Sequence, residues 1–132
     1  MPIGFEFGFR QRLHVVETRP TMWLPQLEAA PWDDTDFIRN VNTFKAVHRI
    51  WNEDGSLEVL DSGNPNVLAL HKTARDQSER AVLLFSKDAQ NLQGYVLPEA
   101  ARRGTLALSD GSHIGVLKPA GYQIFLEKLF TA

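Results

Sequence analysis

Apolar and aromatic side chains recur in residues 34–51 with the period of an α-helix. The steps between them are four, three, four and three, which places them on one helix face: Phe37, Val41, Phe44, His48 and Trp51. Lys45 and Arg49 lie toward the end of this stretch, where positive charge is favourable to a helix, and Gly55 follows it. The pattern predicts one long helix over residues 34–51.

Short apolar stretches separated by turn-forming residues occupy the rest of the chain after the helix. Seven stretches have the length and composition of strands: residues 57–60, 67–71, 80–86, 92–97, 105–108, 114–117 and 121–128. The sequences between them are rich in Asp, Ser, Gly, Asn and Pro, which favour tight turns. A turn signal every eight to twelve residues is typical of all-β folds. We therefore expect a mainly β protein with one long helix, in which residues 52–132 form an antiparallel β-sandwich.

The first 33 residues have no sustained period. Pro20, Pro25 and Pro31 each remove an amide donor and favour extended geometry in the preceding residue, so a long helix is excluded. Residues 13–16 read Leu-His-Val-Val, which is typical of a strand. This part is expected to hold one or two short strands and a loop, which divides the chain into residues 1–33, 34–51 and 52–132.

Composition excludes several classes of function. The chain has no cysteine, which excludes disulfides and a cysteine nucleophile. The net charge is −2 and the 14 Lys and Arg residues are scattered, without the dense positive stripe of a nucleic-acid binder. No stretch approaches the roughly 20 apolar residues that span a membrane, and the N-terminus has no signal-peptide pattern. These features predict a soluble, cytoplasmic protein that binds neither nucleic acid nor membranes.

Four segments carry a resemblance to a known family: MPIGFEFG (residues 1–8), DFIRNVN (residues 36–42), AVLLFS (residues 81–86) and PAGYQIF (residues 119–125). Together they resemble the C-terminal end of an α-amylase superfamily enzyme (glycoside hydrolase family 13). Residues 1–8, MPIGFEFG, resemble the segment at the eighth strand of the catalytic barrel, and residues 36–42, DFIRNVN, resemble the start of its last helix. Residues 81–86, AVLLFS, look like the central strand of the C-terminal β-domain, and residues 119–125, PAGYQIF, like its closing strand. Residues 1–20 look most similar to the maltosyltransferase branch, which acts on α-1,4-glucans.

The resemblance implies an architecture. Residues 1–33 would be a remnant of the last β/α-barrel strand with its loop, and residues 34–51 the last barrel-type helix. Residues 52–132 would be the C-terminal antiparallel β-sandwich of the α-amylase type. The superfamily's catalytic carboxylates project from middle strands of the barrel, which have no counterpart here. The resemblance therefore implies no catalytic residue and no cofactor in this chain.

Three functional hypotheses remain open at this point. In the first, the chain is a non-catalytic C-terminal fragment of an α-glucan-active glycosidase or glycosyltransferase, and it supports a missing catalytic barrel structurally. It would then meet an α-glucan or maltooligosaccharide only through the parent enzyme. In the second, it is an independent carbohydrate-binding β-sandwich with exposed aromatic residues on one sheet face. In the third, it is an unrelated small enzyme or interaction module with a pocket of converging polar groups.

The candidate substrate-binding residues are Glu6, Trp23 and Trp32. Glu6 would lie at the rim of a glucan site by the resemblance, or it would bond neighbouring loop amides. Tryptophan faces stack on sugar rings, and Trp23 is the best candidate for an exposed ring. Trp32 could instead staple the start of the helix, while Trp51 ends the apolar stripe and is expected in the core.

Other polar groups have simpler interpretations. Asp33, Asp34 and Asp36 could suggest a catalytic pair or a calcium loop, but they stand where a helix begins and favour capping. The four histidines have no metal-binding spacing, and no serine lies in a nucleophile elbow. No metal site is predicted.

The N-terminal segment also suggests self-association. Ile3, Phe5 and Phe7 would be covered by neighbouring strands and helices in a complete barrel. Exposed strand edges and apolar patches tend to find a partner. We therefore expect a homodimer through residues 1–16, by strand pairing or by exchange across a two-fold axis.

Overall fold

The computed structural model of the protein describes residues 5–8, 24–25 and 27–129. The chain divides into two compact units, residues 1–45 and 46–132, each of which is considered by itself. The strand expected at residues 13–16 lies outside the described residues.

In the described part of the N-terminal unit, the first element is a single 3-10 turn, η1 (Phe5–Phe7), where the sequence suggested a strand. Gly8 follows it with φ +67°, a left-handed conformation that ends the turn at low steric cost. The Glu6 carbonyl accepts the Asp34 backbone N–H at 2.7 Å, which joins the turn to the segment before the helix. Residues 24–25 and 27–28 are helical, so the described part of residues 1–33 contains turns and short helix in place of strands.

The one long helix of the described residues is α2 (Thr35–Val47), which crosses the boundary between the two units. At its start the Asp33 carboxylate accepts the Thr35 backbone N–H at 2.8 Å, which confirms the capping interpretation for this residue. The helix ends four residues earlier than the apolar stripe predicted. His48 is extended, and a 3-10 turn, η2 (Arg49–Trp51), follows it. None of the thirteen residues of α2 is buried, and Phe37 is 49% exposed.

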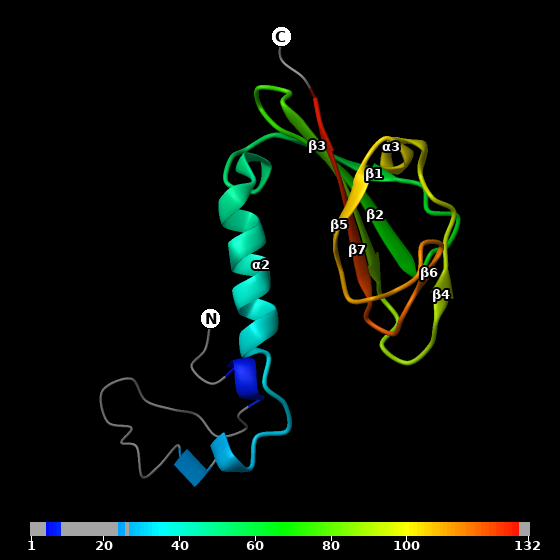
Figure 1. Ribbon diagram of the computed structural model, residues 1–132. Helices are drawn as coiled ribbons and strands as arrows, with labels where there is room; N and C mark the ends of the chain where they lie inside the picture. Colours follow the sequence, from blue (N-terminus) through cyan, green and yellow to red (C-terminus); the bar gives the residue numbers. More distant parts are fainter. Residues whose placement is uncertain (1–4, 9–23, 26, 130–132) are drawn as a thin grey trace. The chain divides into compact units, whose positions relative to one another are not determined.

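The C-terminal unit is built on a five-stranded antiparallel sheet in the order β1-β2-β3-β7-β5 (Figure 1). Its strands are β1 (Ser56–Leu60), β2 (Val67–Thr73), β3 (Glu79–Ser86), β7 (Tyr122–Lys128) and β5 (Thr105–Ser109). A second, two-stranded sheet pairs β4 (Gln93–Gly94) with β6 (Val116–Leu117), and a short helix, α3 (Glu99–Arg102), follows β4. The prediction of a mainly β, antiparallel fold with one long helix is confirmed.

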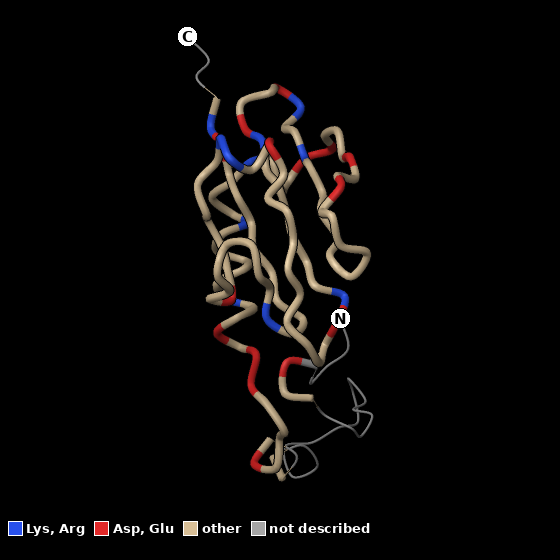
Figure 2. Tube along the Cα trace, turned by 90° about the vertical axis from the view of Figure 1, so that its right-hand side faces the viewer, with Lys and Arg blue, Asp and Glu red and all other residues tan. Residues whose placement is uncertain are grey.

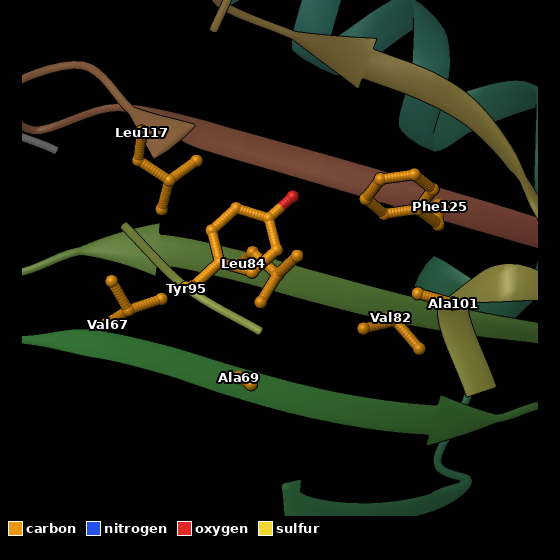
Figure 3. Packing of buried hydrophobic residues seen from close by; sticks show 8 residues of the cluster. All are labelled: Val67, Ala69, Val82, Leu84, Tyr95, Ala101, Leu117 and Phe125. Atoms are coloured by element: carbon orange, nitrogen blue, oxygen red, sulfur yellow. The ribbon is translucent and has the colours of Figure 1, made fainter. Parts of the chain in front are cut away.

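The main core lies between the large sheet and the elements that cover one of its faces. Leu84 is opposite Ala69 on β2 and Gln123 on β7, so side chains of the central strands gather on this inner face. Tyr95, Ala101 and Leu117 come from the region of α3 and the small sheet and pack on them (Figure 3). Leu84 and Leu117 are completely buried.

A polar network runs through this core. Gln123 is completely buried, accepts the hydroxyl proton of Tyr95, and donates from Nε2 to the Ser112 carbonyl at 2.8 Å. The Ser112 hydroxyl donates to Asp110 Oδ1 at 2.6 Å and accepts the Lys118 backbone N–H at 2.9 Å. A buried amide is tolerated when its donors and acceptors are satisfied, and here it fixes the loop before β6 to the last strand.

The opposite, outer face of the sheet has a smaller cluster. Ile50 and Trp51 of η2 pack there against Ala81 and Leu126, and Ala74 completes the group. The sequence placed Trp51 in the core at the end of the helical stripe. In the structure its side chain is half-buried and packs against this cluster from the 3-10 turn, outside α2.

Candidate functional site

In the N-terminal unit, a hollow of about 600 Å³ lies between the η1 turn and the segment before α2. Its described lining consists of Phe7, Leu27, Ala30, Trp32 and Asp33. The hollow exists because the Glu6 carbonyl holds the Asp34 amide, which brings residues far apart in sequence into one neighbourhood. A cavity of this size is in the range of small-molecule sites.

Trp32 is the largest side chain at the hollow and is 53% exposed. One edge of its indole lies against Gly8. A Cβ on Gly8 would be only 2.6 Å from Cζ2 and 2.7 Å from Cε2 of the ring, and 2.9 Å from Cγ of Pro31. The ring therefore occupies space that any residue larger than glycine would need.

Asp33 supplies a carboxylate to the same hollow. Two hydrogen bonds with Thr35 hold the pKa of this carboxyl below its usual range. The bond with the Thr35 side chain has the larger effect, and the bond with its backbone has the smaller one. The group is therefore ionised at neutral pH. Of its two oxygens, Oδ1 accepts the Thr35 amide, and a carboxylate has further acceptor positions.

The structure brings two of the three predicted sugar-binding residues into one region. Trp32 lines the hollow, and Glu6 belongs to the η1 turn beside it, linked to Asp34 through its backbone carbonyl. Trp23 lies outside the described residues. The sequence interpretation missed Phe7, Leu27 and Ala30, which have no chemical signature of their own and reach the hollow only through the tertiary contact.

The C-terminal unit presents a second feature, an apolar surface on the outer face of its sheet. Pairing of Val59 with Leu70 and of Leu68 with Phe85 places apolar side chains of three strands on this face. We define the outer apolar face by Leu57, Val59, Leu68, Leu70 and Phe85. On the edge strand β1, Leu57 and Val59 are 60% and 75% exposed, and the other three are half-buried. Large exposed apolar patches mark interaction surfaces.

Ionisable groups of the C-terminal unit form structural pairs. Glu79 lies 3.2 Å from Nδ1 of His48, and His71 lies 3.9 Å from Glu58. Arg49 forms ion pairs with Glu53 and Asp76. Within the described ranges, no group of three or more His, Cys, Asp or Glu could hold a metal ion.

The charge distribution has no single basic stripe over the described residues. Figure 2 shows basic and acidic positions interspersed along the tube. In the part of the chain that the structure describes, no helix has both the length and the hydropathy to cross a membrane.

Comparison with known proteins gives no family assignment. No protein-family model matches the chain, and no curated protein is significantly similar to it.

Proposed function

We propose that the chain is the C-terminal part of an α-glucan-active enzyme of the α-amylase type, with a structural and non-catalytic role. In this proposal residues 1–33 and 34–51 belong to the end of the catalytic barrel. Residues 52–132 are the C-terminal β-sandwich, which packs on the barrel and shields its last helix. The parent reaction is glucan hydrolysis or maltosyl transfer, in the cytoplasm, and its substrate is an α-glucan or maltooligosaccharide.

The observation that supports this proposal best is the outer apolar face. A sheet of five strands has two faces, and in this unit the small sheet and α3 pack on the inner one. Leu57 and Val59 on the outer face remain largely exposed. Burial of a leucine or valine side chain is worth about 1.5–3 kcal/mol, so such a face favours a packed partner. The outer surface of a barrel, formed by helices, would supply that partner.

An independent carbohydrate-binding role for the β-sandwich has less support. Sugar-binding surfaces of that kind need exposed aromatic rings on one sheet face. Within residues 46–129, each aromatic residue is buried or half-buried: Trp51, Phe85, Tyr95, Tyr122 and Phe125. The exposed aromatic side chains of the described chain, Trp32 and Phe37, belong to the N-terminal unit.

The decisive experiment determines the coding sequence immediately upstream of the chain in its genome and tests its product together with the chain. We expect that sequence to encode a β/α barrel with a carboxylate nucleophile and a carboxylic acid. Co-expression of the two parts should then yield a complex that acts on maltooligosaccharides, with or without phosphate. An upstream sequence that encodes no barrel would refute the proposal. Turnover by the purified chain alone, if it survives further fractionation, would refute the non-catalytic role.

Self-association of the isolated chain through residues 1–16 belongs to the same proposal. Phe5–Phe7 form a 3-10 turn, so contact between two copies at these residues would use side chains in place of strand pairing. Light scattering of the full chain and of a variant without residues 1–10 tests this. A full-length monomer at high concentration would contradict it.

A further inference from the structure

We infer that the hollow at Trp32 is a saccharide-binding subsite, which takes one or two sugar units of an α-linked glucan. The choice of glucan rests on the proposed function, whereas the choice of a saccharide rests on the geometry and chemistry of the hollow. Trp32, Asp33 and Gly8 carry the inference.

The first argument is the aromatic surface. A pyranose ring has an apolar face of C–H groups, which packs on an aromatic plane and removes apolar surface from water. Trp32 lines the hollow, and the residue as a whole is 53% exposed, so part of its surface is accessible to a ligand. Phe7 and Leu27 provide apolar walls around the same space.

The second argument is that the indole is already positioned. Its edge lies against Gly8 so closely that a methyl group on Gly8 would overlap the ring and would also crowd Pro31. Fixing a mobile side chain on binding costs conformational entropy, and a ring already held in place avoids most of this cost. Gly8 therefore acts as a positioning residue, with φ +67° and no side chain.

The third argument is the polar group beside the ring. Sugar hydroxyls donate hydrogen bonds, and an ionised carboxylate is the strongest acceptor among neutral-pH side chains. The Asp33 carboxyl has a lowered pKa because Thr35 donates to it, so it stays an acceptor at neutral pH. An apolar plane with an adjacent acceptor matches the two kinds of surface that a sugar presents.

An organic cation is the competing ligand, since aromatic rings and a carboxylate also bind quaternary ammonium groups. The hollow of about 600 Å³ has room for a sugar unit beside the indole. Cation sites also usually surround the charge with several rings, and Phe7 is only half-exposed here.

The test is a titration of the full chain followed by NMR of the tryptophan indole N–H signals. The ligands are maltotriose, its β-linked counterpart cellotriose, and choline. We expect maltotriose to shift the Trp32 signal, which Trp32→Phe identifies by its absence. Trp32→Ala should weaken binding on the order of ten-fold or more, equal to about 1.4 kcal/mol. Gly8→Ala should also weaken it, because the ring is displaced.

Phe37→Ala is the matched control, since Phe37 is a comparably exposed aromatic residue of the same unit that does not line the hollow. The affinity of Phe37→Ala for maltotriose should stay within about two-fold of that of the original chain. Three results would overturn the inference: no shift with any saccharide, equal losses in Trp32→Ala and Phe37→Ala, or tighter binding of choline than of maltotriose. These results do not test whether the upstream sequence encodes a barrel. Failure of this inference is therefore distinguishable from failure of the proposed function.

Discussion

The Glu79 carboxylate accepts the backbone N–H of Ile50 at 3.2 Å, and thereby joins the η2 turn to the first residue of β3. Its other oxygen lies 3.2 Å from Nδ1 of His48. Glu79 is only 8% exposed and Ile50 is completely buried. This contact explains why the helical stripe of the sequence breaks after Val47, because the Ile50 amide bonds to a side chain of the sheet.

We expect Glu79→Ala to destabilise the C-terminal unit by about 1–3 kcal/mol, because a buried backbone amide loses its acceptor. Urea unfolding followed by circular dichroism measures the change. The control is Glu58→Ala, whose side chain is 68% exposed and 3.9 Å from His71, and which should cost less than about 0.5 kcal/mol. Equal effects of the two substitutions would show that the hydrogen bond from Ile50 to Glu79 does not stabilise the C-terminal unit.

The two faces of the sheet should respond differently to truncation. Leu84→Ala removes a completely buried side chain from the main core and should cost about 2–5 kcal/mol. Leu57→Ala, on the outer apolar face, should change stability by less than about 0.5 kcal/mol in the isolated chain. A large loss in Leu57→Ala would mean that the outer face is already packed in solution.

Much of the fold could be predicted from local sequence pattern. Each of the seven predicted strands overlaps an observed strand, because alternation and turn residues are local signals. The strand expected at residues 92–97 shortens to Gln93–Gly94, since Tyr95 turns inward to Gln123 and the chain then enters α3. The four-residue helix α3 was missed because a single turn has no measurable period.

The candidate site was less predictable, since it depends on contacts between distant segments. Trp32 and Glu6 could be singled out by chemistry alone. The approach of Gly8 to the indole could not, because it follows from the bond between the Glu6 carbonyl and the Asp34 amide. The prediction of a strand near Phe5 was wrong. The structure has a 3-10 turn there, and Gly8 ends that turn in a left-handed conformation.

The hydrogen bonds to Asp88 predict that the fold loses stability in acid at the loop after β3. Backbone N–H groups of Gln90 and Asn91 and side-chain amides of Asn91 and Gln93 donate to its carboxylate. These bonds, with that of Gln90 the strongest, lower the pKa of Asp88 to about 2. The unfolded value is about 3.9, so the carboxylate stabilises the fold above about pH 4, and this contribution is lost as the pH falls toward 2.

Asp88→Asn should therefore be less stable than the original chain near neutral pH, and the difference should shrink as the pH falls from about 4 to about 2. Thermal unfolding across this range measures it. Asp54→Asn, a substitution of the same type at an exposed position between η2 and β1, serves as the control. A difference that stays constant with pH would contradict the assignment of the low pKa to these bonds.

The outer apolar face makes a prediction about dye binding. Apolar patches on a folded protein bind the dye ANS, so the isolated chain should increase its fluorescence. The double substitution Leu57→Lys and Val59→Lys should reduce that signal without lowering stability, because both side chains are largely exposed. A matched double change at exposed positions on either side of β4, Leu92→Lys and Val96→Lys, shows how much of the signal comes from elsewhere. If only the substitutions at Leu92 and Val96 reduce the ANS fluorescence, the outer apolar face is not the surface that binds the dye.

The last prediction concerns the buried pair of Tyr95 and Gln123. The Tyr95 hydroxyl donates to Gln123 Oε1 inside the main core, and burial raises the pKa of this tyrosine. Tyr95→Phe leaves the Gln123 oxygen without that donor, and Gln123→Leu leaves the hydroxyl and the Ser112 carbonyl without theirs. Each single change should cost about 1–3 kcal/mol, the penalty for a buried polar group that loses its partner.

The double variant should cost less than the sum of the two single changes, because removing both partners of a bond leaves neither of them unsatisfied. Urea unfolding of the four proteins gives the coupling energy, which we expect to be about 0.5–3 kcal/mol. The remaining loss in the double variant includes the effect on the Ser112 carbonyl, which loses the Gln123 Nε2 donor. Additive costs would mean that the hydroxyl and the amide do not bond in solution, and that the core tolerates them through other partners.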